Sequence, residues 1–190
     1  IVVKQYEEFN SLEVQNMHRV LIDMIGICPA DKYGLVLWSH ASSWLPVGFQ
    51  TRSFGEEKGM QMDIMELSDA LPVKFDFILF DACLMGAVEV AYELKDNADY
   101  IIASSTETLY TGFPYDMIIP DLMAVSPDLQ KVAKKYMDYY QQLMGVYRSA
   151  TISVINTREL EKLAQITSSL LAGNSINWGL FKRSIVQRLD

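Results

Sequence analysis

A thiol, an imidazole and a carboxylate follow two short apolar runs of this sequence. The run FDFILF, residues 75–80, leads into Asp81 and Cys83, and the run YGLVLW, residues 33–38, leads into His40. In cysteine-dependent catalysis the thiolate is the nucleophile, and a neighbouring imidazolium stabilises it. Cys83 and His40 are therefore the pair that a cysteine protease needs, provided that the fold brings the two run ends together.

The elements around these residues predict an α/β fold. Short, continuously apolar runs are typical of parallel strands that are covered on both faces. The expected strands are residues 1–6, 33–38, 75–80, 100–104 and 151–155. The expected helices are residues 10–26, 62–71, 84–96, 127–144 and 157–172. Strands that alternate with helices indicate an α/β sandwich around a mostly parallel sheet.

In such a sheet the ends of the two apolar runs lie at one edge. Ligands of open α/β sheets bind at the carboxyl ends of the strands. The two runs are joined through a helix, and a right-handed crossover puts their C-terminal ends on the same edge. The helix expected from Leu84 would direct the positive end of its dipole at Cys83.

A purely structural interpretation of the same residues stays open. A cysteine after a buried strand is more often a small core residue than a nucleophile. A histidine after a strand is likewise more often a surface or capping residue. Cys28, which precedes a proline, and His18, inside an expected helix, both look structural.

Composition limits the classes of function. A chain of 190 residues, half of them apolar, is expected to form one domain over 1–190. The formal net charge of −8 argues against nucleic acid as a partner. No apolar run approaches the roughly 18 residues of a membrane span. The sequence opens inside a strand-like run without an initiator Met, so we expect a piece of a longer chain.

The sequence gives no reason to assign a metal or a cofactor. Two cysteines are too few for a disulfide framework or for a Cys-rich zinc site of the usual kind. No D-x-D-x-D-G calcium loop is present. We therefore expect no cofactor.

Three segments together resemble the clostripain family of cysteine peptidases. FDACLMGAVEVAYEL, residues 80–94, is similar to the family's nucleophile segment, in which DACLMG carries the catalytic cysteine. WSHASSW, residues 38–44, resembles its histidine segment, usually written H-G-x-G-W. IIASSTETLYTGFPYD, residues 101–116, is similar to the loop after the next strand. The resemblance implies a caspase-like three-layer α/β/α sandwich and an endopeptidase that cleaves peptides or proteins after basic residues.

The resemblance assigns catalytic roles residue by residue. It implies that Cys83 is the nucleophile and that His40 protonates the leaving amine. The oxyanion would be held by the backbone N–H groups of Cys83 and Ala41. The family usually has glycine where Ala41 and Ser43 stand here. Either this loop adopts ordinary backbone angles, or the site is impaired.

The resemblance also implies a pocket for the substrate side chain before the scissile bond, P1. Asp81 is a natural partner for a guanidinium or ammonium group, although it could equally cap the next helix. Thr111 aligns with the family's second pocket acid and carries no charge. We therefore expect a residual preference for Arg over Lys, because only guanidinium binds a carboxylate bidentately. Trp44 is expected to wall the cleft.

Family members mature by cutting themselves between the histidine and cysteine segments. The corresponding loop, residues 41–62, offers Arg52 and Lys58 as cleavage sites. The resemblance also implies a bacterial envelope or secreted location, and calcium is implied by the family alone. Two alternatives stay open: an impaired peptidase-like domain that serves in binding, and an α/β amidase or esterase of small substrates. The G-x-S-x-G elbow and the Walker and Rossmann glycine patterns are absent.

Overall fold

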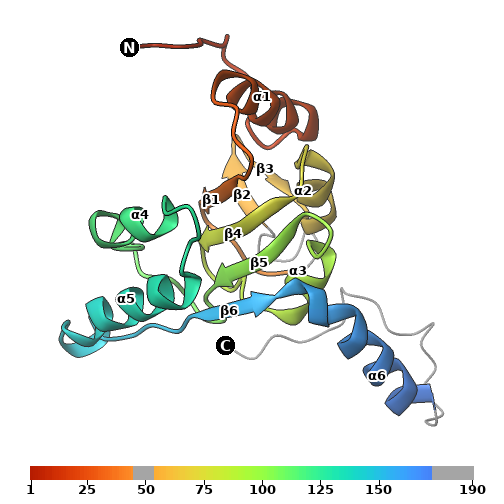
Figure 1. Ribbon diagram of the computed structural model, residues 1–190, viewed down its shortest axis with the longest axis vertical. Helices are drawn as coiled ribbons and strands as arrows, with labels where there is room; N and C mark the ends of the chain where they lie inside the picture. Colours follow the sequence, from red (N-terminus) through yellow and green to blue (C-terminus); the bar gives the residue numbers. More distant parts are fainter. Residues whose placement is uncertain (45–53, 173–190) are drawn as a thin grey trace.

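The computed structural model, which describes residues 1–44 and 54–172, has a four-stranded sheet at its centre (Figure 1). The strands are β1 Gly34–Trp38, β4 Phe75–Asp81, β5 Ala98–Ala103 and β6 Ser153–Asn156, in the order β1-β4-β5-β6. β1, β4 and β5 run parallel, and β6 pairs with β5 in the antiparallel direction. The mostly parallel sheet expected from the apolar runs is confirmed.

Helices cover both faces of this sheet. They are α1 Val14–Ile27, α2 Ile64–Ala70, α3 Val88–Glu93, α4 Tyr115–Leu122, α5 Leu129–Gln141 and α6 Leu160–Ala172, with 3-10 turns at Gly145–Tyr147 and Thr157–Glu159. In Figure 1, α4 and α5 lie on one side of the sheet, and α2, α3 and α6 lie on the other. These three layers are the α/β/α sandwich.

Strand β4 is apolar from Phe77 to Phe80 because both of its faces are buried there. Ile78 and Phe80 belong to the core beneath α2 and α3, whereas Phe77 and Leu79 belong to the core beneath α4 and α5. In a strand, successive side chains point to opposite faces, so a central strand needs apolar residues at every position. The same division separates Ile101 from Ile102 in β5.

A β-hairpin occupies part of the segment where the sequence indicated only a loop. β2 Phe54–Glu57 and β3 Met60–Met62 pair antiparallel. Lys58 and Gly59 connect them, both with positive φ, of 52° and 81°. Two-residue hairpin turns of type I′ require this geometry. Phe54 packs edge-on against Phe80, with 6.1 Å between ring centroids, and so fixes the hairpin to the core.

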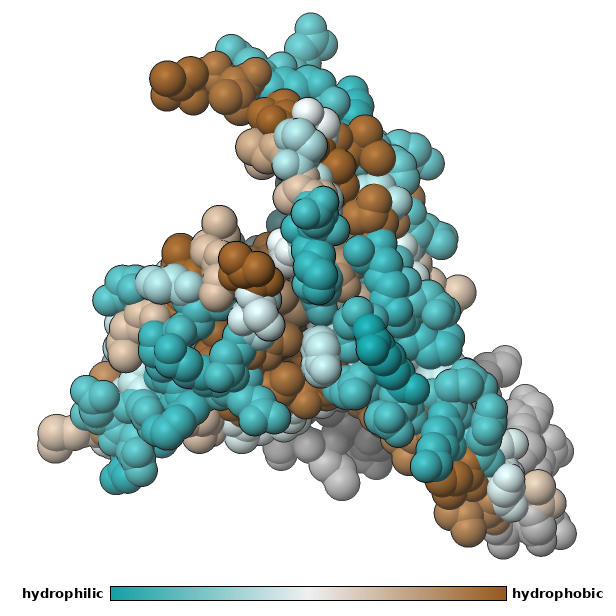
Figure 2. Space-filling model, viewed as in Figure 1, coloured by the Kyte–Doolittle hydropathy of each residue, from teal (hydrophilic) through white to brown (hydrophobic). Residues whose placement is uncertain are grey.

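Two expected elements differ from the structure. Residues 1–6 form no strand, and the apolar N-terminal end projects from the molecule, at the top left of Figure 2. The helix expected from Leu84 begins only at Val88. Its first turn is replaced by contacts with the segment after β5: the N–H of Leu84 bonds to Thr106 O at 3.0 Å, and that of Gly86 to Ser104 O at 2.7 Å.

Candidate active site

His40 and Cys83 lie at matching positions beyond two neighbouring strands. Trp38 of β1 is paired with Asp81 of β4, and each candidate residue follows its member of that pair by two positions. The Ser39 N–H bonds to Asp81 O at 3.4 Å, which continues the pairing past the end of β1. The structure therefore places residues His40 and Cys83 at the same carboxyl edge of the sheet, as the crossover argument expected.

Cys83 is half-buried, in a tight turn that faces the backbone of Thr108. The Thr108 N–H donates to Cys83 Sγ at 3.3 Å, and Sγ lies 3.7 Å from Thr108 O. The Thr108 hydroxyl donates to Ala82 O at 3.2 Å, so one residue holds both the thiol and the residue before it. Leu84 has φ of 66°, a left-handed conformation that is unusual for a residue with a side chain.

The expected helix N-terminus behind the thiol is not present. The nearest helix downstream, α3, begins five residues after Cys83 and is only six residues long. The dipole argument for activation of Cys83 was therefore wrong. The groups that do face its sulfur are the peptide N–H and C=O of Thr108. Cys28, by contrast, is exposed at the end of α1.

The loop after His40 is fixed by hairpin strand β2. His40 O accepts from the Gly55 N–H at 2.8 Å, and Ala41 pairs with Phe54 across an antiparallel bridge. In this pattern the Ala41 N–H points away from β2. Neither that N–H nor the N–H of Cys83 has a hydrogen-bond acceptor among the described residues. Both donors expected for an oxyanion are thus available.

The two departures from the glycine pattern have different consequences. Ala41 is not among the described non-glycine residues with positive φ, so its Cβ causes no backbone strain. Ser43 has φ of 71°, which costs an L-residue about 1–2 kcal/mol. The backbone therefore keeps a glycine-like conformation at Ser43 alone. Between them, Ser42 is buried, and its hydroxyl has no partner in the part of the chain that the structure describes.

Asp81 is buried at the base of this edge, with only 3% of its surface exposed. Its Oδ2 accepts from the hydroxyl of Tyr115 at 2.8 Å and from the N–H of Phe113 at 3.3 Å. Burial raises the pKa of Asp81, and these two hydrogen bonds oppose that shift. No ion pair with Asp81 is found within residues 1–44 and 54–172, and it caps no helix.

The loop that faces Asp81 is tied down through Thr111 and Gly112. The hydroxyl of Tyr140 donates to Gly112 O at 2.9 Å, so the Thr111 hydroxyl is the donor in its 2.8 Å contact with Tyr140. Phe113 is buried and packs against Tyr136, with 4.3 Å between the ring centroids. Thr111 thus contacts Tyr140, whereas Gly112 lies against the Asp81 carboxylate.

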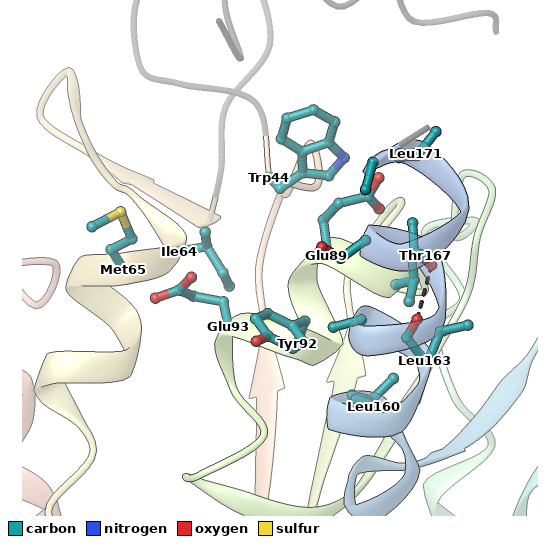
Figure 3. Close-up of a pocket in the computed structure, with 14 residues that line it drawn as sticks. Trp44, Ile64, Met65, Glu89, Tyr92, Glu93, Leu160, Leu163, Thr167 and Leu171 are labelled. Carbon is teal, nitrogen blue, oxygen red and sulfur yellow. Dashed lines mark hydrogen bonds between the residues drawn. The ribbon is translucent and has the colours of Figure 1, made fainter. Parts of the chain in front are cut away.

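Trp44 lies in a different place from Asp81. It lines a groove of about 1010 Å³ between α2, α3 and α6, together with Ile64, Tyr92 and Leu163 (Figure 3). None of Cys83, His40 and Asp81 is among the described residues that line this groove. The role of Trp44 in substrate binding stays a prediction, and its side chain does not share a described pocket with the acid.

The two expected cleavage sites differ in what the structure describes. Lys58 occupies the two-residue turn between β2 and β3, with its ammonium exposed and paired with Glu8. Arg52 lies outside the described residues. Cleavage at either residue stays a prediction.

No three His, Cys, Asp or Glu side chains lie together in a group that could hold a metal ion, as far as residues 1–44 and 54–172 are concerned. In that same part of the chain, no helix has the length and apolar character to cross a bilayer. A role for calcium stays a prediction from the family resemblance.

This chain is similar to known proteins in both sequence and fold. Clostripain of Hathewaya histolytica is 42% identical in a 66-residue alignment that covers 31% of this chain and 12% of that protein. A secreted C11 cysteine protease from Bacteroides thetaiotaomicron, solved with an irreversible peptide inhibitor, is 37% identical over 89% of this chain and 52% of its own, with a TM-score of 0.78. An inactive zymogen C11 protease from Parabacteroides distasonis is 36% identical over 96% and 52%, with a TM-score of 0.80.

The chain spans about half the length of these solved relatives. Their fold is caspase-like, and the close structural match confirms that this fold extends to the present chain. The model of the Clostripain family matches residues 1–177, nearly the whole sequence. The chain therefore belongs to the clostripain family.

Proposed function

We propose that this chain carries the catalytic dyad of a cysteine endopeptidase, with Cys83 as nucleophile and His40 as acid and base. The observation that carries the proposal is the pairing of Trp38 with Asp81, because it sets both residues at equal distance beyond adjacent parallel strands. Family membership supports the same chemistry. In the absence of substrate, catalytic contacts are often longer than a hydrogen bond, so placement at one edge is the relevant test.

The reaction divides into two acyl-transfer steps. The Cys83 thiolate attacks the scissile carbonyl carbon, and the negative charge moves to the carbonyl oxygen. The N–H groups of Cys83 and Ala41, which have no acceptor among the described residues, are available to stabilise that oxyanion. Collapse breaks the C–N bond, and the His40 imidazolium gives its proton to the leaving amine. His40 then takes a proton from water, whose oxygen attacks the thioester carbon, and the C–S bond breaks to release the carboxylic acid and the Cys83 thiolate beside the His40 imidazolium.

We infer that Asp81 selects a basic P1 side chain. A buried carboxylate without an ionic partner is costly, and a substrate cation would offset that cost. Asp81 is buried and has no ionic partner among the described residues, and burial already raises its pKa. Thr111 offers a neutral hydroxyl where a second acid would strengthen the attraction. One carboxylate favours Arg over Lys, because the planar guanidinium can bind it with two parallel hydrogen bonds.

The proposal includes self-cleavage within residues 41–62 and an exported location. The Parabacteroides distasonis relative is named as a zymogen, which is consistent with activation by cleavage, and the Bacteroides thetaiotaomicron relative is named as secreted. Peptides or proteins are the expected substrates. The backbone of Ala41 is unstrained, which argues against an impaired domain that serves only in binding.

Active-site labelling tests the dyad directly. A peptidyl acyloxymethyl ketone that ends in Arg should modify Cys83 and leave the exposed Cys28 unmodified, as mapped by mass spectrometry of tryptic peptides. His40→Ala should lower kcat/KM for a fluorogenic peptide by roughly 10²–10⁴-fold, whereas His18→Ala in α1 should leave it unchanged. Modification of Cys28, or full activity in His40→Ala, would contradict the mechanism. Turnover of small amides without turnover of peptides would favour an amidase instead.

A further inference from the structure

The two oxygens of the Asp81 carboxylate have different surroundings. Oδ2 receives both hydrogen bonds, from the Tyr115 hydroxyl at 2.8 Å and from the Phe113 N–H at 3.3 Å. Oδ1 accepts no hydrogen bond from the residues that the structure describes. It also does not belong to the fully buried polar atoms that lack a hydrogen-bond partner. The protein thus satisfies one oxygen and leaves the other open.

Two tyrosines from different helices fix the loop that covers this carboxylate. Tyr140 of α5 donates to Gly112 O, and Tyr115, the first residue of α4, donates to Asp81 itself. Gly112 lies directly against the acid, since a Cβ at this position would be 2.6 Å from Oδ2 and 3.1 Å from Oδ1. The loop and the carboxylate are therefore positioned together, and within residues 1–44 and 54–172 Tyr115 provides the one side-chain hydrogen bond to Asp81.

We propose that Tyr115 is a positioning residue for substrate specificity, which orients Asp81 so that Oδ1 faces the P1 cation. This inference rests on the proposed function, in particular on Asp81 as the pocket acid. Without the phenol hydroxyl, Oδ2 keeps only the longer bond from Phe113, and the carboxylate is free to rotate toward it. The loss should reduce turnover of cationic P1 residues and spare the chemistry at Cys83.

The ionisation of Asp81 supplies an independent readout. Its pKa is raised by burial and lowered by the bonds from Tyr115 and Phe113, so removal of the Tyr115 hydroxyl raises it further. The other titratable groups that face Asp81 are the phenols of Tyr136 and Tyr140 on α5, whose pKa values burial raises and which therefore stay neutral. No basic side chain in the described part of the chain pairs with Asp81. The acid limb of the pH profile for an Arg substrate should then move to higher pH.

The test compares Tyr115→Phe with a matched control in the full chain. Tyr92→Phe on α3 also removes a phenol that donates to a carboxylate, that of Glu161 at 3.2 Å, on the opposite face of the sheet. The substrates are two peptides that differ only at P1, Arg in one and neutral citrulline in the other. Tyr115→Phe should lower kcat/KM for the Arg peptide about tenfold, mainly through KM, and change the citrulline peptide less than about twofold. Tyr92→Phe should change neither.

The outcomes distinguish the positioning role of Tyr115 from the proposed role of Asp81 as the acid of the P1 pocket. An equal loss on both peptides with an unmoved acid limb would show that Tyr115 only maintains the fold, and would overturn the inference. If Asp81→Asn keeps the full Arg preference, the pocket acid is misassigned and the inference falls with it, while the Cys83 chemistry stands. If turnover is too low to measure, binding of the two peptides to Cys83→Ala is compared with and without Tyr115→Phe, and an unchanged Arg preference there would also overturn it.

Discussion

Gly112 lies against Asp81 so closely that a Cβ on the glycine would be 2.6 Å from the carboxylate Oδ2. Its φ of 59° adds a second requirement for glycine, since L-residues are strained in that region. The carboxylate and the loop that covers it therefore fit together only without a side chain at position 112.

Gly112→Ala should disturb both the fold and the pocket. The backbone strain costs about 1–2 kcal/mol, and displacement of Asp81 adds to it. Gly145→Ala is the matched control, because Gly145 has φ of 61° and nothing within 4 Å of its Cβ position. Denaturant unfolding should show a larger loss for Gly112→Ala, and kcat/KM should fall more for an Arg than for a neutral P1 residue. Equal losses of stability in the two variants would contradict the close contact.

A change in the pH dependence of stability should accompany Asp81→Asn. The pKa of Asp81 is raised in the folded state, so the folded chain binds more protons than the unfolded chain between the two pKa values. The unfavourable contribution of Asp81 therefore grows as the pH rises from the unfolded value, and the stability of Asp81→Asn relative to the native chain should grow with it. Chemical unfolding between pH 4 and 7 measures this difference.

Asp99 provides a control of opposite sign. Its pKa is lowered, first by the hydrogen bond from Arg158 and also by Lys74, so its contribution to stability is present above the unfolded pKa and is lost as the pH falls. Asp99→Asn should thus lose stability relative to the native chain as the pH rises toward the unfolded pKa, so this comparison extends to below about pH 4. Parallel slopes in the two variants would rule out the raised pKa of Asp81.

The strands that carry the site could be predicted from the sequence because each one is a short, continuous run of apolar residues. A strand covered on both faces needs mostly apolar side chains, and this placed β4 within one residue of its observed ends. The apolar run of β1 was placed as closely, although its Val36 and Trp38 are exposed in the structure. The order of the two runs and the handedness of the crossover then sufficed to place His40 and Cys83 at one edge. Both steps depend on general rules and not on detailed contacts.

The turn after Cys83 depends on contacts that the sequence does not display. Residues 84–94 have the apolar spacing of a helix, but Leu84 and Gly86 bond to the segment after β5 and delay its start to Val88. Helix α4 was missed because Pro120 lies inside it and interrupts the helical pattern. The hydrogen bond between Tyr115 and Asp81 joins residues 34 positions apart, and no local spacing predicts it.

Ser43→Gly should stabilise the chain slightly and leave catalysis intact. Ser43 has φ of 71°, and glycine would relieve that strain at the cost of more entropy in the unfolded chain. The net gain should be about 0.5–1 kcal/mol. Ser42→Gly is the control, because Ser42 is buried with ordinary φ and should lose stability instead. Thermal unfolding distinguishes the two, and a loss of stability in Ser43→Gly would contradict the strain.

The last prediction concerns the site of self-cleavage, and it rests on the proposed peptidase activity. A protease binds its substrate in an extended conformation, but Lys58 is held in a two-residue hairpin turn, between β strands and paired with Glu8. Cleavage after Lys58 would require the hairpin to open and Phe54 to leave its contact with Phe80. Arg52 is also the better fit to a pocket with one carboxylate. Lys58→Ala should therefore process normally, whereas Arg52→Ala should stay uncut, as read from fragment masses after incubation. Processing that stops in Lys58→Ala and continues in Arg52→Ala would reverse the assignment and show that the hairpin forms only after cleavage.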